Sequence, residues 1–408
     1  MRNTEQIICS VDVGTTKICV LIARVHPGGV IEVVSSGYTL SNGLKKGVVV
    51  DLEEAAASIR MAREEAEHRS GLSVDWVTVG ITGNHIESYN CRGAIQVEGR
   101  NREVTHSDVE QVIRAAQSIP IKPERTIIHV LTQEFLLDNR EVQNPVGLTG
   151  SRLDANIHVV TCDSALLQNL VNAVNRADMR VQKVVLQQLA SAESVLTRDE
   201  RELGSAIVDI GGGTTDVAVF LKNALRFAAF IPVGGINFTR DLAIGLRTPL
   251  EDAEQIKKES GSVLVENIGS DEVVLAPPVG GGNERTQPRA LLCEYLRARA
   301  VELFEMVNAK FEEAGAADQL VAGVVLTGGG STLEGMVELA EQVMEVPVRQ
   351  GLPGGVTGLS DDLSHPVFAT AIGLAKFVGT QDERLNSLVG KSTASSKLVN
   401  RFLSWVGN

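Results

Sequence analysis

Two stretches of this 408-residue chain share one pattern, VDVGTTK at residues 11–17 and VDIGGGTTD at residues 208–216. Each contains an apolar residue, an aspartate, an apolar residue, glycine and a Thr-Thr pair in that order, and each lies between two runs rich in β-branched residues. Each stretch therefore predicts two strands joined by a tight turn. The repetition of the pattern indicates an internal duplication of one structural unit.

Both turns have the chemistry of an anion site. Glycine lets backbone N–H groups come close to phosphate oxygens, and threonine hydroxyls add further donors. Asp12 and Asp209 would face the same space, either as oxygen partners of a hydrated Mg²⁺ or as groups that orient an attacking water. The candidate phosphate-binding residues are Gly14, Thr15, Thr16, Lys17, Gly211, Gly212, Gly213, Thr214 and Thr215.

A third glycine-rich stretch, LTGGGSTL at residues 326–333, joins an apolar strand to a helix that we expect to begin at Ser331. Such a junction would place a positive helix end and bare backbone beside a nucleotide. Its candidate residues are Gly328, Gly329, Gly330 and Ser331. One glycine turn alone is ordinary, but two matching hairpins together with a third turn are not. No P-loop or dinucleotide fingerprint competes, because residues 385–392 end in Gly-Lys-Ser without the leading glycine.

The composition limits the class of protein. A formal charge of −13 argues against a general nucleic-acid binder, and no nucleic-acid partner is expected. Five scattered cysteines favour a reduced, cytosolic setting, and the first residues have no secretory signal pattern. No apolar run approaches the roughly 20 residues that a membrane-spanning helix needs. Strands alternate with long helices, which predicts α/β architecture.

The last residues differ from the acidic average. Residues 391–408 hold three basic side chains and no acidic ones, whereas residues 1–390 carry −16. On a helical wheel, the apolar residues of 397–408 fall within about 160°. A helix of this length spans about 18 Å, so we expect it to lie in the interface of an anionic phospholipid membrane. The alternative is a helix docked on the protein's own core. The membrane-facing candidates are Lys397, Leu398, Val399, Arg401, Phe402, Leu403, Trp405 and Val406.

The order hairpin, hairpin, glycine turn resembles the actin-like ATPase superfamily, and within it nearly the whole chain resembles the FtsA family of bacterial cell-division proteins. Residues 10–17, 86–160, 204–220, the GGINF stretch at 234–238 and the tail carry the likeness. The resemblance implies a two-lobed α/β fold of duplicated ribonuclease-H-like lobes, with an inserted subdomain in the first lobe and a C-terminal amphipathic helix. ATP and Mg²⁺ would lie between the lobes, with Asp12 and Asp209 on the metal side.

The resemblance also assigns further residues. Gly235, Asn237, Glu254, Lys257 and Lys258 would line the nucleotide, and an i, i+3 spacing places the last three on one helical face. The water-orienting residue falls at Gln187 or Gln188. Relatives often have Pro after this position, where this chain has Leu189. We therefore expect slow ATP hydrolysis at most, with the nucleotide acting mainly as a conformational and polymerisation switch.

The implied organisation has six parts. The first lobe comprises residues 1–85 and 162–197, and the inserted subdomain comprises 86–161. The second lobe comprises 198–226 and 303–380, with a subdomain at 227–302. A flexible linker at 381–396 precedes the membrane-targeting helix at 397–408.

The implied function is that of an ATP-binding protein that polymerises on the cytoplasmic face of the inner membrane at the division site. There it would tether FtsZ through the FtsZ C-terminal peptide and recruit later divisome membrane proteins. The surface that receives an acidic peptide has four basic candidates, Arg285, Arg289, Arg297 and Arg299. Two alternatives remain, an actin-like pilus-assembly ATPase, which would not need the tail, and a small-molecule kinase of the same superfamily.

Overall fold

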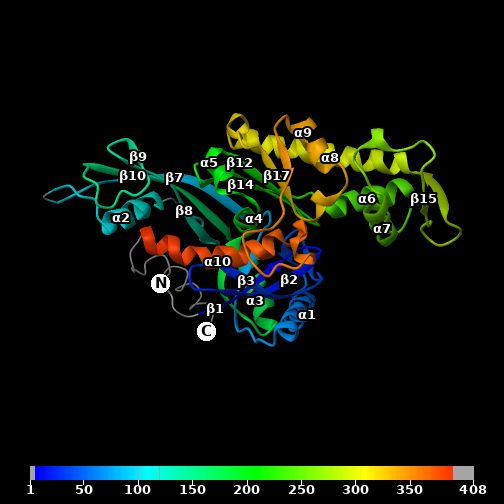
Figure 1. Ribbon diagram of the computed structural model, residues 1–408, viewed down its shortest axis with the longest axis horizontal. Helices are drawn as coiled ribbons and strands as arrows, with labels where there is room; N and C mark the ends of the chain where they lie inside the picture. Colours follow the sequence, from blue (N-terminus) through cyan, green and yellow to red (C-terminus); the bar gives the residue numbers. More distant parts are fainter. Residues whose placement is uncertain (1–4, 100, 119, 389–408) are drawn as a thin grey trace.

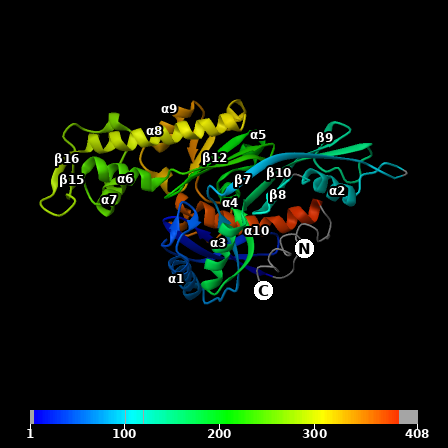
Figure 2. The ribbon, with the colours of Figure 1, turned by 180° about the vertical axis from the view of Figure 1, so that it is seen from behind.

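The computed structural model describes residues 5–99, 101–118 and 120–388, and only the backbone of residues 380–388. In this part of the chain, two five-stranded sheets form the centre of an elongated molecule (Figure 1). The inserted subdomain with α2 lies at one end of the long axis, and α6, α7 and β15 lie at the other. Figure 2 shows the same arrangement from behind.

The first sheet has the order β11-β6-β1-β2-β3. Its strands β1 (Gln6–Val13), β2 (Lys17–Val25) and β3 (Ile31–Leu40) form an antiparallel meander. β6 (Trp76–Ile81) pairs with β1 in parallel, and β11 (Arg180–Leu186) pairs with β6 in parallel. The short strands β4 (Leu44–Lys45) and β5 (Val48–Val49) form a separate ribbon.

Helices cover both faces of this sheet because alternate residues of β2 point to opposite sides. Ile18, Val20 and Ile22 pack with α1 (Leu52–Ser70) and α3 (Ser164–Arg176). Leu21 and its same-face neighbours pack with α10 (Ala369–Leu388). Asp51 caps α1 by accepting from two backbone N–H groups, and Gly71 ends it with a φ of 67°.

The second sheet has the order β14-β13-β12-β17-β18, which repeats the topology of the first. β12 (Ser205–Ile210), β13 (Thr215–Leu221) and β14 (Ala224–Ile231) form the meander. β17 (Val324–Thr327) and β18 (Val348–Gln350) follow in parallel. The predicted duplication and the two-lobed α/β fold are therefore confirmed.

The helix α4 (Gln187–Val195) connects the two lobes. A buried cluster joins α4 to β11 of the first sheet, β12 of the second sheet and α10. The following helix, α5 (Arg198–Leu203), is capped by Thr197 and leads into β12. α4 therefore packs against elements of both lobes.

The inserted segment forms a four-stranded antiparallel sheet with a core of its own. The sheet order is β7-β10-β8-β9. Its elements are β7 (Ile86–Gln96), α2 (His106–Ala116), β8 (Arg125–Leu137), β9 (Arg140–Val142) and β10 (Arg152–Asp163). Asp154 on β10 is fully buried and lies 2.8 Å from the guanidinium of Arg152 and 3.0 Å from that of Arg92.

The subdomain at the other end contains helices and a two-stranded hairpin. Its elements are α6 (Gly235–Leu246), α7 (Leu250–Ser260), η1 (Val265–Asn267), β15 (Val273–Ala276), β16 (Arg285–Pro288) and the start of α8 (Arg289–Glu313). The remaining elements are η2 (Ala317–Gln319), η3 (Gly329–Thr332), α9 (Met336–Met344), η4 (Asp362–Ser364) and η5 (Pro366–Phe368).

Three expected boundaries differ from the structure. α8 is one continuous helix across the expected division at 302/303. α10, which we assigned to the second lobe, packs against the first sheet because its apolar face matches the residues of β1 and β2 that α1 and α3 leave uncovered. α10 also continues to Leu388, so the first eight residues of the expected linker are helical. The rest of the linker and the expected membrane helix lie outside the described residues.

Candidate nucleotide site

The two hairpin turns have the same geometry. The N–H of Gly14 donates to the carbonyl of Lys17 at 3.0 Å, and the N–H of Gly211 donates to the carbonyl of Thr214 at 2.8 Å. Asp12 and Asp209 therefore occupy equivalent places near the ends of β1 and β12. The strand register places Cys19 opposite Asp12 but Asp216 opposite Asp209.

The two turns face each other and are in contact. A Cβ atom built on Gly212 would lie less than 3.0 Å from the side chain of Thr16, and one built on Gly213 would come equally close to Thr15. The absence of a side chain at these two glycines is therefore what allows the lobes to approach so closely. The N–H of Gly47 also donates to Thr15 Oγ1 at 3.2 Å.

Polar side chains of α4 each reach a different carboxylate. Gln187 Nε2 donates to Asp12 Oδ1 at 3.1 Å, and Gln188 Nε2 donates to Asp216 Oδ1 at 2.8 Å. Ser191 Oγ donates to Asp209 Oδ2 at 2.6 Å. All three donors are buried. The helix between the lobes thus holds aspartates of both lobes in place.

Two threonines complete these contacts. Thr82, just after β6, donates to Asp216 Oδ1 at 2.6 Å, and Thr370 on α10 donates to Asp209 Oδ2 at 3.0 Å. Each of these hydrogen bonds links the second lobe to an element packed on or next to the first sheet. All five of these donors to the carboxylates are buried side chains.

Burial shifts the proton affinities of all three aspartates. It raises the pKa of Asp12 to about 6, with the ammonium of Lys17, 3.7 Å away, opposing the rise. Burial also raises the pKa of Asp209, against the hydrogen bonds from Ser191 and Thr370. Burial raises the pKa of Asp216 to about 8, and the nearby charges of Asp209 and Asp12 add to this rise. A cation placed among these carboxylates would relieve their mutual repulsion.

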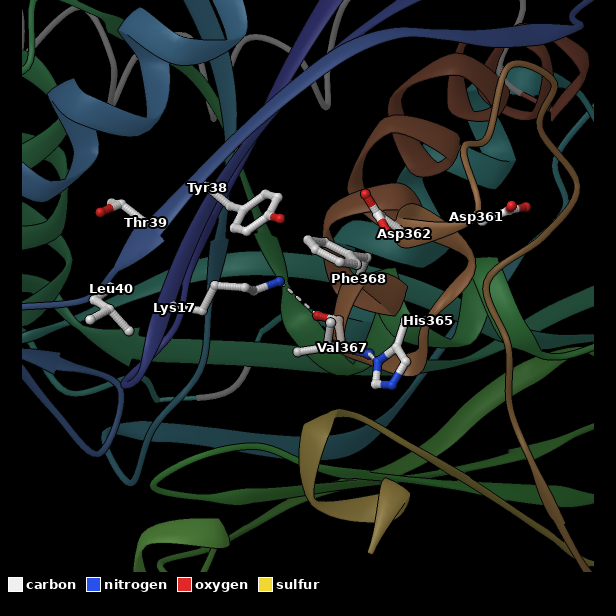
Figure 3. Close-up of a pocket in the computed structure, with 9 residues that line it drawn as sticks. All are labelled: Lys17, Tyr38, Thr39, Leu40, Asp361, Asp362, His365, Val367 and Phe368. Carbon is white, nitrogen blue, oxygen red and sulfur yellow. Dashed lines mark hydrogen bonds between the residues drawn. The ribbon is translucent and has the colours of Figure 1, made fainter. Parts of the chain in front are cut away.

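Lys17 contacts elements outside its own turn. Its ammonium donates to the carbonyl of Val367 at 2.7 Å and lies 4.2 Å from the ring centroid of Phe368 (Figure 3). It also pairs with Asp12 at 3.7 Å. The side chain of Lys17 therefore connects the first hairpin to the segment that precedes α10.

The third glycine turn lies against the second hairpin. A Cβ on Gly328, which has a φ of 80°, would lie less than 3.0 Å from Asp209 Oδ1, and Gly330 is equally close to Ile210. The helix expected from Ser331 is wrong. Residues 329–332 form a 3₁₀ turn, and α9 begins at Met336 because Gly335, with a φ of 85°, redirects the chain. Ser331 Oγ instead donates to the carbonyl of Gly328 at 2.8 Å.

The start of α6 packs directly on the second hairpin. The N–H of Gly235 donates to the carbonyl of Gly211 at 2.9 Å, and that of Ile236 donates to Gly212 at 2.7 Å. Asn237 Oδ1 accepts from the N–H of Gly234 at 3.1 Å and so caps the helix. The start of α6 is thus joined to the turn by backbone hydrogen bonds.

α7 adds the charged group expected from its spacing. Lys257 Nζ lies 2.6 Å from Glu254 and donates to the carbonyl of Gly235 at 3.1 Å, and Lys258 lies 3.3 Å from Glu254. Burial lowers the pKa of Lys257, and the Glu254 carboxylate opposes this shift. Lys257 therefore lies next to the start of α6, and Glu254 links it to Lys258.

The sequence is similar to known cell-division proteins along almost its whole length. A family model described as "Cell division protein FtsA" matches residues 206–373, and one described as "SHS2 domain inserted in FTSA" matches residues 83–161. The cell division protein FtsA of Pseudomonas aeruginosa is 41% identical, and the match covers 99% of this chain and 98% of that protein. The chain belongs to the FtsA family. The SHS2 match covers the segment that forms the four-stranded inserted sheet.

Solved structures agree on the fold of this FtsA-family member. A chain of the PilM-PilN type IV pilus biogenesis complex superposes with a TM-score of 0.64 at 15% identity, covering 93% of this chain and all of that one. MreB5 of Spiroplasma citri bound to ADP superposes with a TM-score of 0.57 at 14% identity, covering 94% and 98%. The fold is thus that of actin-like ATPases, and one protein with this fold binds ADP.

One predicted phosphate ligand of the FtsA-family chain has a structural role here. The hydroxyl of Thr215 is fully buried on β13 and donates to the carbonyl of Val233 at 2.8 Å. Conversely, sequence reasoning did not assign Thr82, Ser191, Asp216 or Thr370 to the site. Asp216 ends the second quoted motif, which is a local signal, whereas Thr82 and Thr370 reach the carboxylates only through the tertiary fold.

The residues present fit a nucleotide with a hydrated cation. Carboxylate oxygens are the ligands that Mg²⁺ prefers, and burial raises the pKa of both Asp12 and Asp209, so a nearby cation would favour their charged forms. Among the described residues, no three His, Cys, Asp or Glu side chains gather closely enough to hold a metal ion by themselves. A cation here would therefore keep several waters or take oxygens from a phosphate.

A separate groove of about 350 Å³ lies between α6 and α8. Ile244, with 76% of its surface exposed, stands at this groove beside Tyr295. The remaining lining residues are Asp241, Gly245, Ala298, Arg299 and Glu302.

Among the described residues, no helix is both long enough and apolar enough to cross a membrane.

Each of the four arginines expected to receive an acidic peptide is already engaged within the chain. Arg285 donates to the carbonyl of Leu246 at 3.0 Å, Arg289 pairs with Glu272 at 2.6 Å, and Arg297 pairs with Glu266 at 3.4 Å. Arg299 pairs with Asp241 at 2.5 Å and with Glu302. An acidic peptide would have to compete with these contacts, which the sequence could not reveal because the partners lie on other elements.

Proposed function

We propose that this cell-division protein of the FtsA family binds ATP with Mg²⁺ between its two lobes. The observation that carries the proposal is the convergence of both hairpin turns, the third glycine turn and the start of α6 around buried aspartates. Glycine-rich turns and buried carboxylates from both halves of a duplicated fold meet at one place, which is what a triphosphate and its cation require. The fold likeness to an ADP-bound protein supports the proposal.

Each group of residues at the site would have its own role in nucleotide binding. The backbone and hydroxyls of residues 14–16 and 211–214 would hold phosphate oxygens, and Asp12 and Asp209 would hold the cation through water. Gly328 and Gly329 would lie under the nucleoside, and Glu254 and Lys257 beside the base. The bound metal would supply charge neutralisation at the phosphates. Thr215 would hold β13 in place and not contact phosphate.

Nucleotide entry would be linked to a movement of the lobes. Because Thr16 and Gly212 are in contact, a phosphate between the turns requires them to separate. A ligand that binds only the separated state shifts the population toward that state. We expect hydrolysis to be slow, with Gln187 as the residue that orients water, since its amide is already held by Asp12.

In the cell, we propose that residues 397–408 attach the protein to the cytoplasmic face of the inner membrane at the division site. A single short amphipathic helix binds a membrane weakly, and a filament of many copies binds far more tightly through effective concentration. ATP-dependent self-assembly would therefore control attachment. The filament would tether FtsZ, and the inserted subdomain would contribute to contacts that recruit later divisome proteins.

The test is co-sedimentation with vesicles that contain phosphatidylglycerol. Full-length protein and a chain that ends at Ser396 are compared with and without ATP and Mg²⁺. We expect only the full-length chain to pellet with the vesicles, and ATP to increase the fraction that does. Equal pelleting of both chains would refute the role of the tail.

We further propose that the groove between α6 and α8 receives the FtsZ C-terminal peptide. Two acidic side chains offset Arg299 there, so the apolar surfaces of Ile244 and Tyr295 would supply most of the contact. Ile244→Asp should abolish binding of a fluorescent peptide measured by anisotropy. Leu203→Asp alters an exposed leucine on α5 and serves as the matched control. Equal peptide affinity in both variants would exclude this groove.

A further inference from the structure

A hollow of about 740 Å³ opens beside the first hairpin, separate from the groove on α8 (Figure 3). One wall is the end of β3, with Tyr38, Thr39 and Leu40. The other is the segment before α10, with Asp361, Asp362 and His365. Lys17, Val367 and Phe368 line the space between the two walls. The function proposed above does not use this hollow.

The hollow combines an apolar interior with an acidic rim. The rings of Tyr38 and Phe368 meet edge to face with centroids 5.4 Å apart, and Leu40 is 79% exposed. Asp361 and Asp362 are exposed, and within the described ranges neither carboxylate forms a salt bridge. The complementary ligand is therefore a segment that carries both apolar and basic side chains.

We propose that the chain's own C-terminal segment, residues 397–408, docks in this hollow when no membrane is present. The proposal rests on the proposed role of this segment as the membrane anchor. The segment supplies the complementary chemistry, because it contains Lys397 and Arg401, no acidic residue, and six apolar residues at helical spacing. The acidic body of −16 favours the same association over long range.

The chain is long enough for this docking. Phe368 and Val367 line the hollow immediately before α10, which then runs 20 residues to Leu388, a path of about 30 Å. Residues 389–396 can extend over about 26 Å at roughly 3.3 Å per residue. A helix at 397–408 covers about 18 Å more. The segment can therefore turn back along α10 and reach the hollow of its own chain.

Trp405 provides a direct readout without lipid. The chain has two tryptophans, so Trp76→Phe leaves Trp405 as the single tryptophan in the full-length protein. We expect its emission to be blue-shifted and protected from acrylamide, compared with a free peptide of residues 391–408. The protection should be independent of protein concentration. Protection that rises with concentration would mean docking on another copy and would overturn the proposal.

The variant Asp361→Lys/Asp362→Lys tests the hollow itself. In the Trp76→Phe background, the protection of Trp405 should disappear. Glu312→Lys/Asp318→Lys changes the net charge equally, at exposed residues of the second lobe, and should retain it. Leu40→Asp, at an exposed position, removes the apolar contact and should also abolish protection. If Trp405 is as protected in both hollow variants as in the control, the proposal is wrong.

Vesicle binding separates this proposal from the proposed function. If about nine tails in ten are docked, the apparent affinity of the nucleotide-free protein for phosphatidylglycerol vesicles is reduced about tenfold. The apparent vesicle affinity of Asp361→Lys/Asp362→Lys should be about tenfold higher than that of the parent chain. Glu312→Lys/Asp318→Lys should keep the affinity of the parent chain. If full-length protein and the chain ending at Ser396 pellet equally, the membrane role fails whatever the Trp405 signal shows. If the two hollow variants bind vesicles no more tightly than the control, docking does not restrain the anchor.

Discussion

Gly212→Ala perturbs the place where the two lobes meet. Gly212 is not among the glycines with a positive φ, so alanine fits its backbone and the cost comes from the added methyl group. That methyl would lie less than 3.0 Å from three atoms of Thr16, a separation that real Cβ atoms essentially never show. Overpacking of this kind costs about 1–3 kcal/mol. We expect Gly212→Ala to lower the free energy of unfolding of the nucleotide-free chain by this amount.

A double-mutant cycle in urea identifies the cause. Thr16→Ala removes Oγ1 and Cγ2 but retains Cβ, which lies 2.9 Å from the methyl group added at position 212. It should therefore restore only part of the stability that Gly212→Ala loses. Thr16→Gly should rescue it fully, with a coupling energy of about 0.5–3 kcal/mol. Gly354→Ala is the control, because nothing lies within 4 Å of its added methyl. Strictly additive effects of the changes at positions 16 and 212 would refute the contact between the hairpins.

Three further outcomes follow from the same site. Burial raises the pKa of Asp216 to about 8, so this carboxyl group stays protonated in the folded chain at pH values where it is ionised in the unfolded chain. Its contribution to the free energy of unfolding is therefore largest below the ordinary carboxyl pKa. That contribution is lost as the pH rises toward 8, by about 1.4 kcal/mol per pH unit. Asp216→Asn should remove this loss in urea titrations with chelator at about pH 6 and pH 8, and parallel pH profiles would contradict it. Gln187→Ala leaves buried Asp12 without its amide donor and should lower the free energy of unfolding by about 1–3 kcal/mol. The control, Gln168→Ala, breaks a half-buried hydrogen bond to Asn172 on α3 and should cost less. Gly328→Ala places a side chain at a position with a positive φ, where it would also clash with Asp209. It should weaken ATP binding in calorimetry far more than Gly329→Ala, whose added methyl has its nearest atom 3.4 Å away. Equal effects of the two variants would exclude the close packing of the third turn on Asp209.

Some parts of this molecule follow from local sequence and others do not. The hairpins were predictable because Gly-Thr-Thr turns between β-branched runs are a local signal, and their repetition indicated the duplication. The cap of α1 by Asp51 and the charged face of α7 are also local. The 3₁₀ turn after Gly328 was missed because Ser331 is a good helix cap by itself, and the positive φ of Gly335 is a feature of the fold.

The network around the carboxylates depends on tertiary structure. Ser191 is one residue in a short helix, and nothing near it in the sequence indicates that it faces Asp209 from the other lobe. Thr370 lies 161 positions from the same aspartate. The placement of α10 on the first sheet has the same origin, because an apolar helix face is compatible with either lobe until the partner surface is known.

Calorimetric titration of ATP with Mg²⁺ into the full-length chain tests the central claim most directly. If the two hairpins and their aspartates form the nucleotide site, the parent chain and Gly354→Ala bind ATP, and neither Asp209→Ala nor Gly212→Asp does. Circular dichroism of each variant confirms that it is folded. Unchanged ATP affinity in both Asp209→Ala and Gly212→Asp would contradict the assignment of the site.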